Sequence, residues 1–110
     1  MAYKATHRFA RIAPRKARLV AELIRSRPVE DALIQLEVSK LRAAWYFKAV
    51  LKSAIANAEE LDADLGSLIV SESRVDEGPT MKRHRPKDRG RAHPILKRSS
   101  HLYVTLEENV

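Results

Sequence analysis

Residues 81–98, MKRHRPKDRGRAHPILKR, decide how this chain is organised. They contain eight Lys and Arg residues and one acid, Asp88, and so account for the entire net charge of +7. The apolar residues of this basic segment are Met81, Ala92, Ile95 and Leu96. Because so few apolar groups cannot form a core, the segment either lies in solvent or is neutralised by a polyanion.

Two predicted strands flank the basic segment. Residues 68–76, LIVSESRVD, have the composition of a strand, and residues 101–106, HLYVTL, alternate between apolar and polar side chains. The 24 residues between these strands are an unusually long connection for a compact domain. We therefore expect the strands to continue into the basic segment as a long two-stranded ribbon, with a turn at residues 86–90, PKDRG.

Such a ribbon would project from the rest of the protein. The chain from Leu68 to Asp88 would span ~65 Å when fully extended. A compact chain of this size has a radius of gyration of only about 13 Å. Because an isolated two-stranded ribbon is marginally stable in water, we expect the tip to become ordered only against its partner.

The length and composition of the chain indicate a single domain. A length of 110 residues with 45% apolar content allows a single modest core. We expect a body at about 1–77 plus 101–110 and an extended hairpin at about 78–100. The absence of Cys excludes disulfides, and we find no apolar run suited to a signal peptide or a membrane span.

A second basic block lies at the N-terminus. Residues 1–27 contain eight Lys and Arg residues and one acid, Glu22, whereas residues 28–80 contain five bases and ten acids. This segregation indicates that one face of the protein is turned to a polyanion and another to water or a different partner.

The N-terminal half predicts a short strand followed by helices. Residues 3–12 alternate in character, and one side of this strand comprises Tyr3, Ala5, His7 and Phe9. A first helix is expected to begin at Pro14, because the N–H that proline lacks is not needed in a first turn. A second helix is expected to begin near Pro28, where Arg27-Pro28 ends the first.

The third predicted helix is the longest, at about residues 41–61. Ser39 is its expected cap. Its core stripe comprises Phe47, Val50, Leu51, Ala54, Ala58 and Leu61. Trp45, Tyr46 and Phe47 are consecutive and cannot all face a core, so one or two of them contact RNA or a neighbouring protein, or are only partly buried.

The charge pattern favours nucleic acid as the partner. Arg binds phosphate with its planar guanidinium and also stacks on the exposed bases of folded RNA. A regulator of duplex DNA would carry its charge on a recognition helix, which would leave the ribbon unexplained. A membrane-surface protein would interleave large apolar residues with its bases, whereas residues 81–94 contain only Met81 and Ala92. A solvated charge run or a localisation signal is the remaining alternative.

We expect no catalytic residues, no cofactor and no metal site. The chain has no Cys, and its histidines do not show HxxxH or HxH spacing. They are His7, His84, His93 and His101. Neither a Gly-rich phosphate loop nor a nucleophile elbow is present in the sequence.

The chain resembles a known family, the bacterial L-twenty-two proteins of the large ribosomal subunit, over nearly its full length. The matching strings are PRKARLVAELIR (14–25), LKSAIANAE (51–59), VDEGPTMKRHRPKDRGRAHPILKRSSH (75–101) and LYVTL (102–106). The third string is the most specific, because it has VDEGP, MKR, GRA and ILKR in the family's order.

The resemblance implies an α+β fold, with three helices packed on a small antiparallel sheet and a long projecting β-hairpin. It implies a non-enzymatic structural protein of the large ribosomal subunit, in the cytoplasm or in an organellar ribosome. Such a protein binds large-subunit ribosomal RNA, supports subunit assembly and contacts neighbouring ribosomal proteins. Its hairpin lines the nascent-peptide exit tunnel, near nascent polypeptide and macrolides. Neither a membrane partner nor a homo-oligomer is expected.

Two sets of site residues follow from the basic blocks and the resemblance together. The expected RNA-binding residues are Arg8, Arg11, Arg15, Lys16, Arg18, Arg25, Lys82, Arg83, His84, Arg85, Lys87, Arg89, Arg91, His93, Lys97 and Arg98. The expected tunnel-lining residues are Met81, Lys82, Arg83, Lys87, Asp88, Arg89, Gly90, Arg91 and Ala92. In similar proteins, changes near the MKR string alter macrolide sensitivity.

The chain departs from the family pattern at two positions. Ala13 stands where the family often has Ser as the cap of the first helix, which weakens that cap by about 1 kcal/mol. Asp88 is an acid within the basic tip, so we expect it to face the tunnel lumen, a turn amide or a neighbouring Arg.

Overall fold

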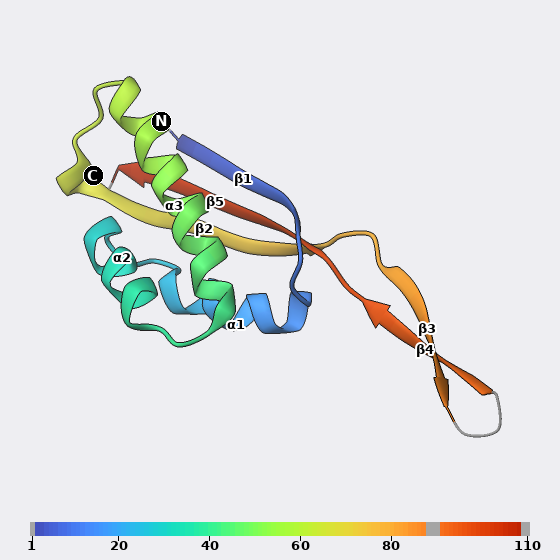
Figure 1. The fold of residues 1–110 in the computed structure, drawn as a ribbon. Coiled ribbons are helices and arrows are strands. Elements are labelled where there is room, and N and C mark those ends of the chain that lie inside the picture. The colour runs from blue at the N-terminus through green and yellow to red at the C-terminus, as the bar shows by residue number, and fades with distance from the viewer. Residues whose placement is uncertain (1, 88–90, 109–110) are drawn as a thin grey trace.

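A computed structural model describes residues 2–87 and 91–108, with only the backbone described at residues 85–87 and 91–94. The chain has the expected α+β architecture, with three helices packed on an antiparallel sheet and a β-hairpin that extends away from them (Figure 1). In chain order the elements are β1 (Ala2–Ala10), α1 (Pro14–Ile24), α2 (Val29–Val38), α3 (Arg42–Glu60), the 3₁₀ turn η1 (Leu65–Ser67), β2 (Leu68–Glu77), β3 (Met81–Lys87), β4 (Arg91–Lys97) and β5 (Ser100–Glu108).

The core lies between the helices and the three-stranded sheet. The strand order is β1-β5-β2, and both pairings are antiparallel, so β5 is central. The alternation predicted for β5 is confirmed, because Leu102, Val104 and Leu106 are fully buried. Phe47 and Leu51 of α3 belong to the same core cluster. Burial of these apolar side chains is what holds the helices on one face of the sheet.

The hairpin is a second, separate sheet. Strands β3 and β4 pair from Met81 opposite Lys97 to Lys87 opposite Arg91. The prediction of one continuous ribbon is therefore wrong in part, because residues 78–80 and 98–99 separate the two sheets. The predicted turn at residues 86–90 falls largely on residues 88–90, which lie outside the described residues. The radius of gyration of 17.0 Å and the extents of 63 × 24 × 17 Å reflect the projecting hairpin.

The joint between the two sheets is tightly bonded. The Ser99 hydroxyl donates to the carbonyl of Pro79 at 2.6 Å, and the Gly78 amide donates to the carbonyl of Ser99 at 3.0 Å. A Cβ atom on Gly78 would lie 2.6 Å from the Ser99 hydroxyl, which explains glycine at this position. The Ser100 hydroxyl donates to the carbonyl of Ile12 at 2.7 Å, and this buried bond fastens the joint to the loop between β1 and α1.

A β-bulge in β1 corrects the predicted strand 3–12. His7 pairs with Leu102 and Ala10 pairs with Ser100, so two residues of β1 lie opposite His101. The bulge shifts the alternation by one position, which places Ala10 in the core and leaves Phe9 59% exposed with a φ of 59°. Phe9 therefore does not share the buried side of the strand, and its amide donates to Nδ1 of His101 at 3.0 Å.

The ends of α3 also differ from the prediction. The residue before the first turn is Leu41, without a side-chain cap, and the Ser39 hydroxyl only accepts a bond from the Leu41 amide at 3.3 Å. At the other end, Leu61 follows the last helical residue and is 58% exposed, so it is not part of the core stripe. Ala13 caps α1 without a side-chain hydrogen bond, as its identity predicts. None of the described helices is long and apolar enough to cross a membrane.

We predict that Ser100→Ala lowers the free energy of unfolding by about 1–3 kcal/mol, because it leaves the buried carbonyl of Ile12 without its donor. Ser73→Ala is the matched control. Ser73 is equally buried, but its hydroxyl has no hydrogen-bond partner among the described residues, so its loss should leave stability unchanged or raised. Urea denaturation measures both variants. Equal losses would contradict the fastening role of Ser100.

Candidate nucleic-acid interface

A basic hollow of about 460 Å³ lies where the β1–α1 loop, the start of α3 and the base of the hairpin meet. Its lining residues are Arg11, Ile12, Ala13, Lys16, Arg42, Tyr46, Lys97 and Arg98. Five of these residues are cationic and none is acidic. Such a set of like charges repels itself unless an anion enters, so the hollow is suited to a polyanion.

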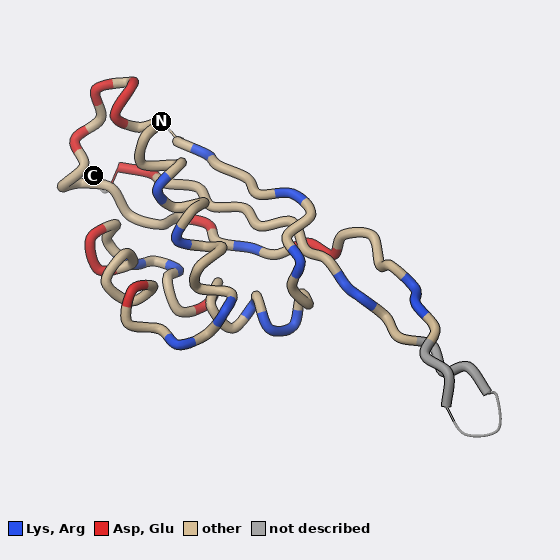
Figure 2. The backbone as a smooth tube through the Cα atoms, viewed as in Figure 1, with Lys and Arg blue, Asp and Glu red and all other residues tan. Residues whose placement is uncertain are grey.

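A second hollow of about 350 Å³ continues this surface along α1. It is lined by Ala13, Pro14, Arg15, Lys16, Arg18, Glu77 and Arg98, and so shares three residues with the basic hollow. The two hollows thus form one positively charged surface. Figure 2 shows a cluster of acids in the loop after α3, at the end of the body far from the hairpin, and further acids on α2 and at the end of β2.

The fold brings these distant residues together through the joint. Because the Ser100 hydroxyl holds the carbonyl of Ile12, the neighbours of Ile12 are placed beside the neighbours of Ser100. Arg11 therefore faces the same hollow as Lys97 and Arg98. These residues are about 86 positions apart in the chain, so the hollow is a product of the tertiary fold.

Two helices begin at this surface, and neither has an acid in its first turn. Arg15 and Lys16 follow Pro14 at the start of α1, and Arg42 is the first residue of α3. Cations at the positive end of a helix dipole are unfavourable, whereas a bound anion there is stabilised. By contrast, α2 does have acids in its first turn, and no residue of α2 lines either hollow. This difference indicates that the starts of α1 and α3 are adapted to an anion.

The lining of the basic hollow also includes Arg42, which the sequence prediction missed, and Tyr46, which it named only as one of three consecutive aromatic residues. A guanidinium nitrogen of Arg42 donates to the Tyr46 hydroxyl at 3.3 Å, and the guanidinium carbon lies 5.8 Å from the centre of the Tyr46 ring. The His7 ring packs edge to face with the Tyr46 ring, with the ring centres 5.6 Å apart. The available signal was the four-residue spacing of Arg42 and Tyr46, which places them on one face of the helix.

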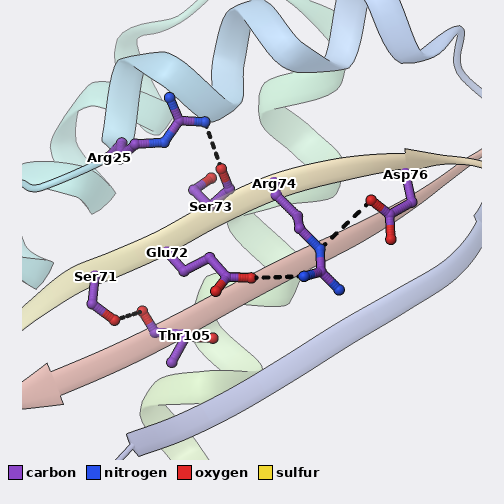
Figure 3. A network of polar contacts seen from close by, with 7 residues as sticks. All are labelled: Arg25, Ser71, Glu72, Ser73, Arg74, Asp76 and Thr105. Atoms are coloured by element: carbon purple, nitrogen blue, oxygen red, sulfur yellow. Dashed lines mark hydrogen bonds and ion pairs between the residues drawn. The ribbon is translucent and has the colours of Figure 1, made fainter.

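Two predicted RNA-binding residues have bonds inside the protein. Arg18 donates to the carbonyl of Val75 at 3.2 Å, and Arg25 donates to the carbonyl of Ser73 at 2.7 Å (Figure 3). Ser26 adds a backbone bond to the carbonyl of Val70 at 2.8 Å. These donors cover the outer edge of β2, so Arg18 and Arg25 have a structural role whether or not they also bind phosphate.

The other predicted residues lie along β1 and the hairpin. Arg8 is exposed at the bulge of β1, and Lys82, Arg83 and His84 are exposed on β3, outside both hollows. Met81 is half-buried at the start of β3. Five further predicted residues have only the backbone described: Arg85, Lys87, Arg91, Ala92 and His93. Asp88, Arg89 and Gly90 lie outside the described residues.

The uncovered face of the sheet has a different charge pattern. Arg74 lies between Glu72 at 3.2 Å and Asp76 at 3.6 Å (Figure 3). Its guanidinium carbon lies 4.3 Å from the centre of the Tyr103 ring. Because two carboxylates neutralise this arginine, the face does not attract a polyanion as the basic hollow does. Within the described ranges, no group of three or more His, Asp or Glu side chains is placed to hold a metal ion.

The charged residues that line this hollow are all cationic, and the hollow lies on a three-helix α+β body next to a basic hairpin. These features are typical of the class of structural proteins with a surface suited to a polyanion. More particularly, the chain belongs to the ribosomal protein L22p/L17e family, whose sequence model matches residues 5–107. The large ribosomal subunit protein uL22 of Oleidesulfovibrio alaskensis is 46% identical over 110 residues, which cover 99% of this chain and 100% of that relative.

The family membership confirms the resemblance expected from the sequence. A member of this family is a structural ribosomal protein, so the chain is not an enzyme. The predicted location in the large subunit of the cytoplasmic ribosome agrees with the family of the chain and with the bacterial source of this relative.

We predict that Arg25→Ala lowers the free energy of unfolding by about 1 kcal/mol in the absence of RNA, because it removes the bond to the Ser73 carbonyl. Arg15→Ala, which lies in α1 and has no hydrogen bond to the sheet, should change stability by less than about 0.5 kcal/mol. Urea denaturation measures the free energy of unfolding of both variants, and the difference shows which arginine stabilises the fold. A neutral effect of Arg25→Ala would show that its bond to β2 does not stabilise the fold.

Proposed function

We propose that this structural constituent of the large ribosomal subunit binds the ribosomal RNA of that subunit through the basic hollow and the adjoining surface of α1. The observation that supports this most directly is the set of five cations around a hollow of about 460 Å³ with no acid in its lining. Lys97 and Arg98 extend the surface to the hairpin, so body and hairpin would contact one continuous RNA ligand.

The shape of the site favours folded RNA over duplex DNA. A DNA-reading helix must insert an exposed face into the major groove. Here α1 packs on β2 with its buried residues, and Arg18 and Arg25 are bonded to the carbonyls of that strand. A concave basic surface instead accommodates the closely spaced phosphates of a folded RNA backbone. The body would therefore anchor the protein and support assembly of the subunit.

The hairpin, in this proposal, extends from the anchored body to line the nascent-peptide exit tunnel. Its support is the family membership together with the geometry of β3 and β4, which leave the helices behind and project from the body (Figure 1). The exposed side chains of Lys82, Arg83 and His84 would contact RNA along its length. The tip would lie near nascent polypeptide and macrolides, and neighbouring ribosomal proteins would contact the body.

We expect the double variant Arg11→Gln/Arg98→Gln to weaken binding of purified large-subunit ribosomal RNA and to make binding less sensitive to salt. Each phosphate contact contributes a slope of roughly −0.7 to −0.9 in a plot of log affinity against log salt. Losing two contacts should therefore make the slope less negative by about 1.4 to 1.8. Filter binding at several salt concentrations measures this change.

Arg74→Gln is the matched control for that experiment, because Arg74 is exposed but neutralised by Glu72 and Asp76 on the opposite face of the sheet. It should keep the affinity and the salt slope of the unaltered protein. A double variant that binds with an unchanged slope would exclude the basic hollow as the RNA site.

Deletion of residues 82–92 should leave the body folded and able to join large subunits, because the core and the basic hollow lie outside this segment. Circular dichroism and co-sedimentation with large subunits measure these two properties. The change should instead appear in the response of the assembled ribosome to macrolides. An unfolded deletion variant would contradict the separation of hairpin and core.

A further inference from the structure

The side chain of Trp45 on α3 is unexplained by the packing of the protein. Trp45 is the only tryptophan of the chain, and it is 69% exposed. The next two residues of α3, Tyr46 and Phe47, are both buried. A large aromatic ring left in solvent contributes little to the core, and exposed aromatic rings are typical of surfaces that bind a partner.

The surroundings of Trp45 form a shallow basic hollow of their own, of about 250 Å³. Its lining is Trp45, Lys48, Ala49 and Lys52. Lys48 and Ala49 lie three and four residues after Trp45, and Lys52 lies four and three residues after them, so the set lies along one face of the helix. Ala49 has a small side chain, which leaves open space between the indole ring and Lys52. The hollow thus combines a flat aromatic wall with cations.

The two lysines are not equivalent. Lys48 lies 3.3 Å from Glu37 of α2, so its charge is partly neutralised. Within the part of the chain that the structure describes, Lys52 has no such acidic neighbour within ion-pair distance. Lys52 is therefore the cation that remains to contact an anionic group beside the indole ring.

The Trp45 hollow adjoins the basic hollow. Tyr46 lines the basic hollow, and its ring meets the Trp45 ring edge to face, with the ring centres 5.0 Å apart and the planes at 78°. Arg42, one turn before Trp45 on the helix, also lines the basic hollow. A ligand that fills the basic hollow can therefore continue along α3 to Trp45 without leaving the positively charged surface.

We propose that Trp45 is a stacking platform for an unpaired base of the bound RNA, with Lys52 contacting a phosphate next to that base. This inference rests on the proposed function. RNA is favoured over a protein partner because the Trp45 ring contacts Tyr46 of the basic hollow and both charged residues of the Trp45 lining are lysines. An aromatic ring beside a cation is a recurring arrangement for unpaired nucleotides, since any base can stack on it.

The test uses the full-length protein, purified large-subunit ribosomal RNA and the intrinsic fluorescence of Trp45. Stacking of a base on the indole should quench this fluorescence as RNA is added. Trp45→Leu keeps an apolar side chain but removes the ring, and it should weaken RNA binding about tenfold. Trp45→Phe keeps an aromatic ring and should weaken binding by less than about threefold. Leu61→Ala, at an apolar residue that is 58% exposed just after the end of α3, is the control and should bind normally.

The outcomes separate this inference from the function on which it rests. Unquenched fluorescence, with Trp45→Leu binding RNA as tightly as the unaltered protein, overturns the stacking platform. If Arg11→Gln/Arg98→Gln still weakens binding in that case, the proposed function stands and Trp45 is left as an apolar contact for a protein neighbour. If the unaltered protein itself fails to bind the RNA, the proposed function fails and the inference falls with it.

Discussion

The bond between the Ser100 hydroxyl and the carbonyl of Ile12 is the constraint on which the rest of the structure depends. It is buried, it joins residues 88 positions apart, and it fastens the joint below the hairpin to the loop before α1. Two consequences follow from this one contact. The hairpin leaves the body from a fixed base, and Arg11 comes to face Lys97 and Arg98 across the basic hollow. A serine is suited to this position because its small hydroxyl can satisfy a carbonyl inside the core without displacing apolar side chains.

The arginines of α1 and of its C-cap have two different roles. Arg18 and Arg25 donate to carbonyls of β2, whereas Arg15 lies in the second hollow without a bond to the sheet. The guanidinium allows this division, because it has five donors and one of its nitrogens can bind a carbonyl while the others remain exposed. A count of basic residues in the sequence therefore overstates the number of cations that are available to a ligand. The same reasoning applies to Arg74, whose charge is balanced by two carboxylates on the open face of the sheet.

Much of the fold could be predicted because its signals are local. Pro14 marks the start of α1, the apolar stripe marks α3, and the alternation of residues 101–106 marks β5. The errors have physical causes that do not show in a pattern. The bulge at Phe9 shifts the alternation of β1, and the separation of the two sheets depends on how Gly78 fits against Ser99. For the site, residue type and charge predicted Arg11, Lys97 and Arg98, but not that Ser100 would gather them. Arg42 was missed because a single cation at the start of a helix in an acidic region has no distinctive signal until the fold places it in the hollow.

The covered edges of the sheet affect how the free protein behaves before it is assembled into the large subunit. An open edge strand is a template on which other chains can add strands and aggregate. On β2 this edge is occupied by Arg18, Arg25 and Ser26, and on β1 the Asn57 amide of α3 donates to the carbonyl of Lys4 at 2.9 Å. Both borders of the sheet are thus partly closed by the body itself, without RNA. The fold thereby restrains self-association through strand addition during the interval between synthesis of the protein and its assembly into the large subunit.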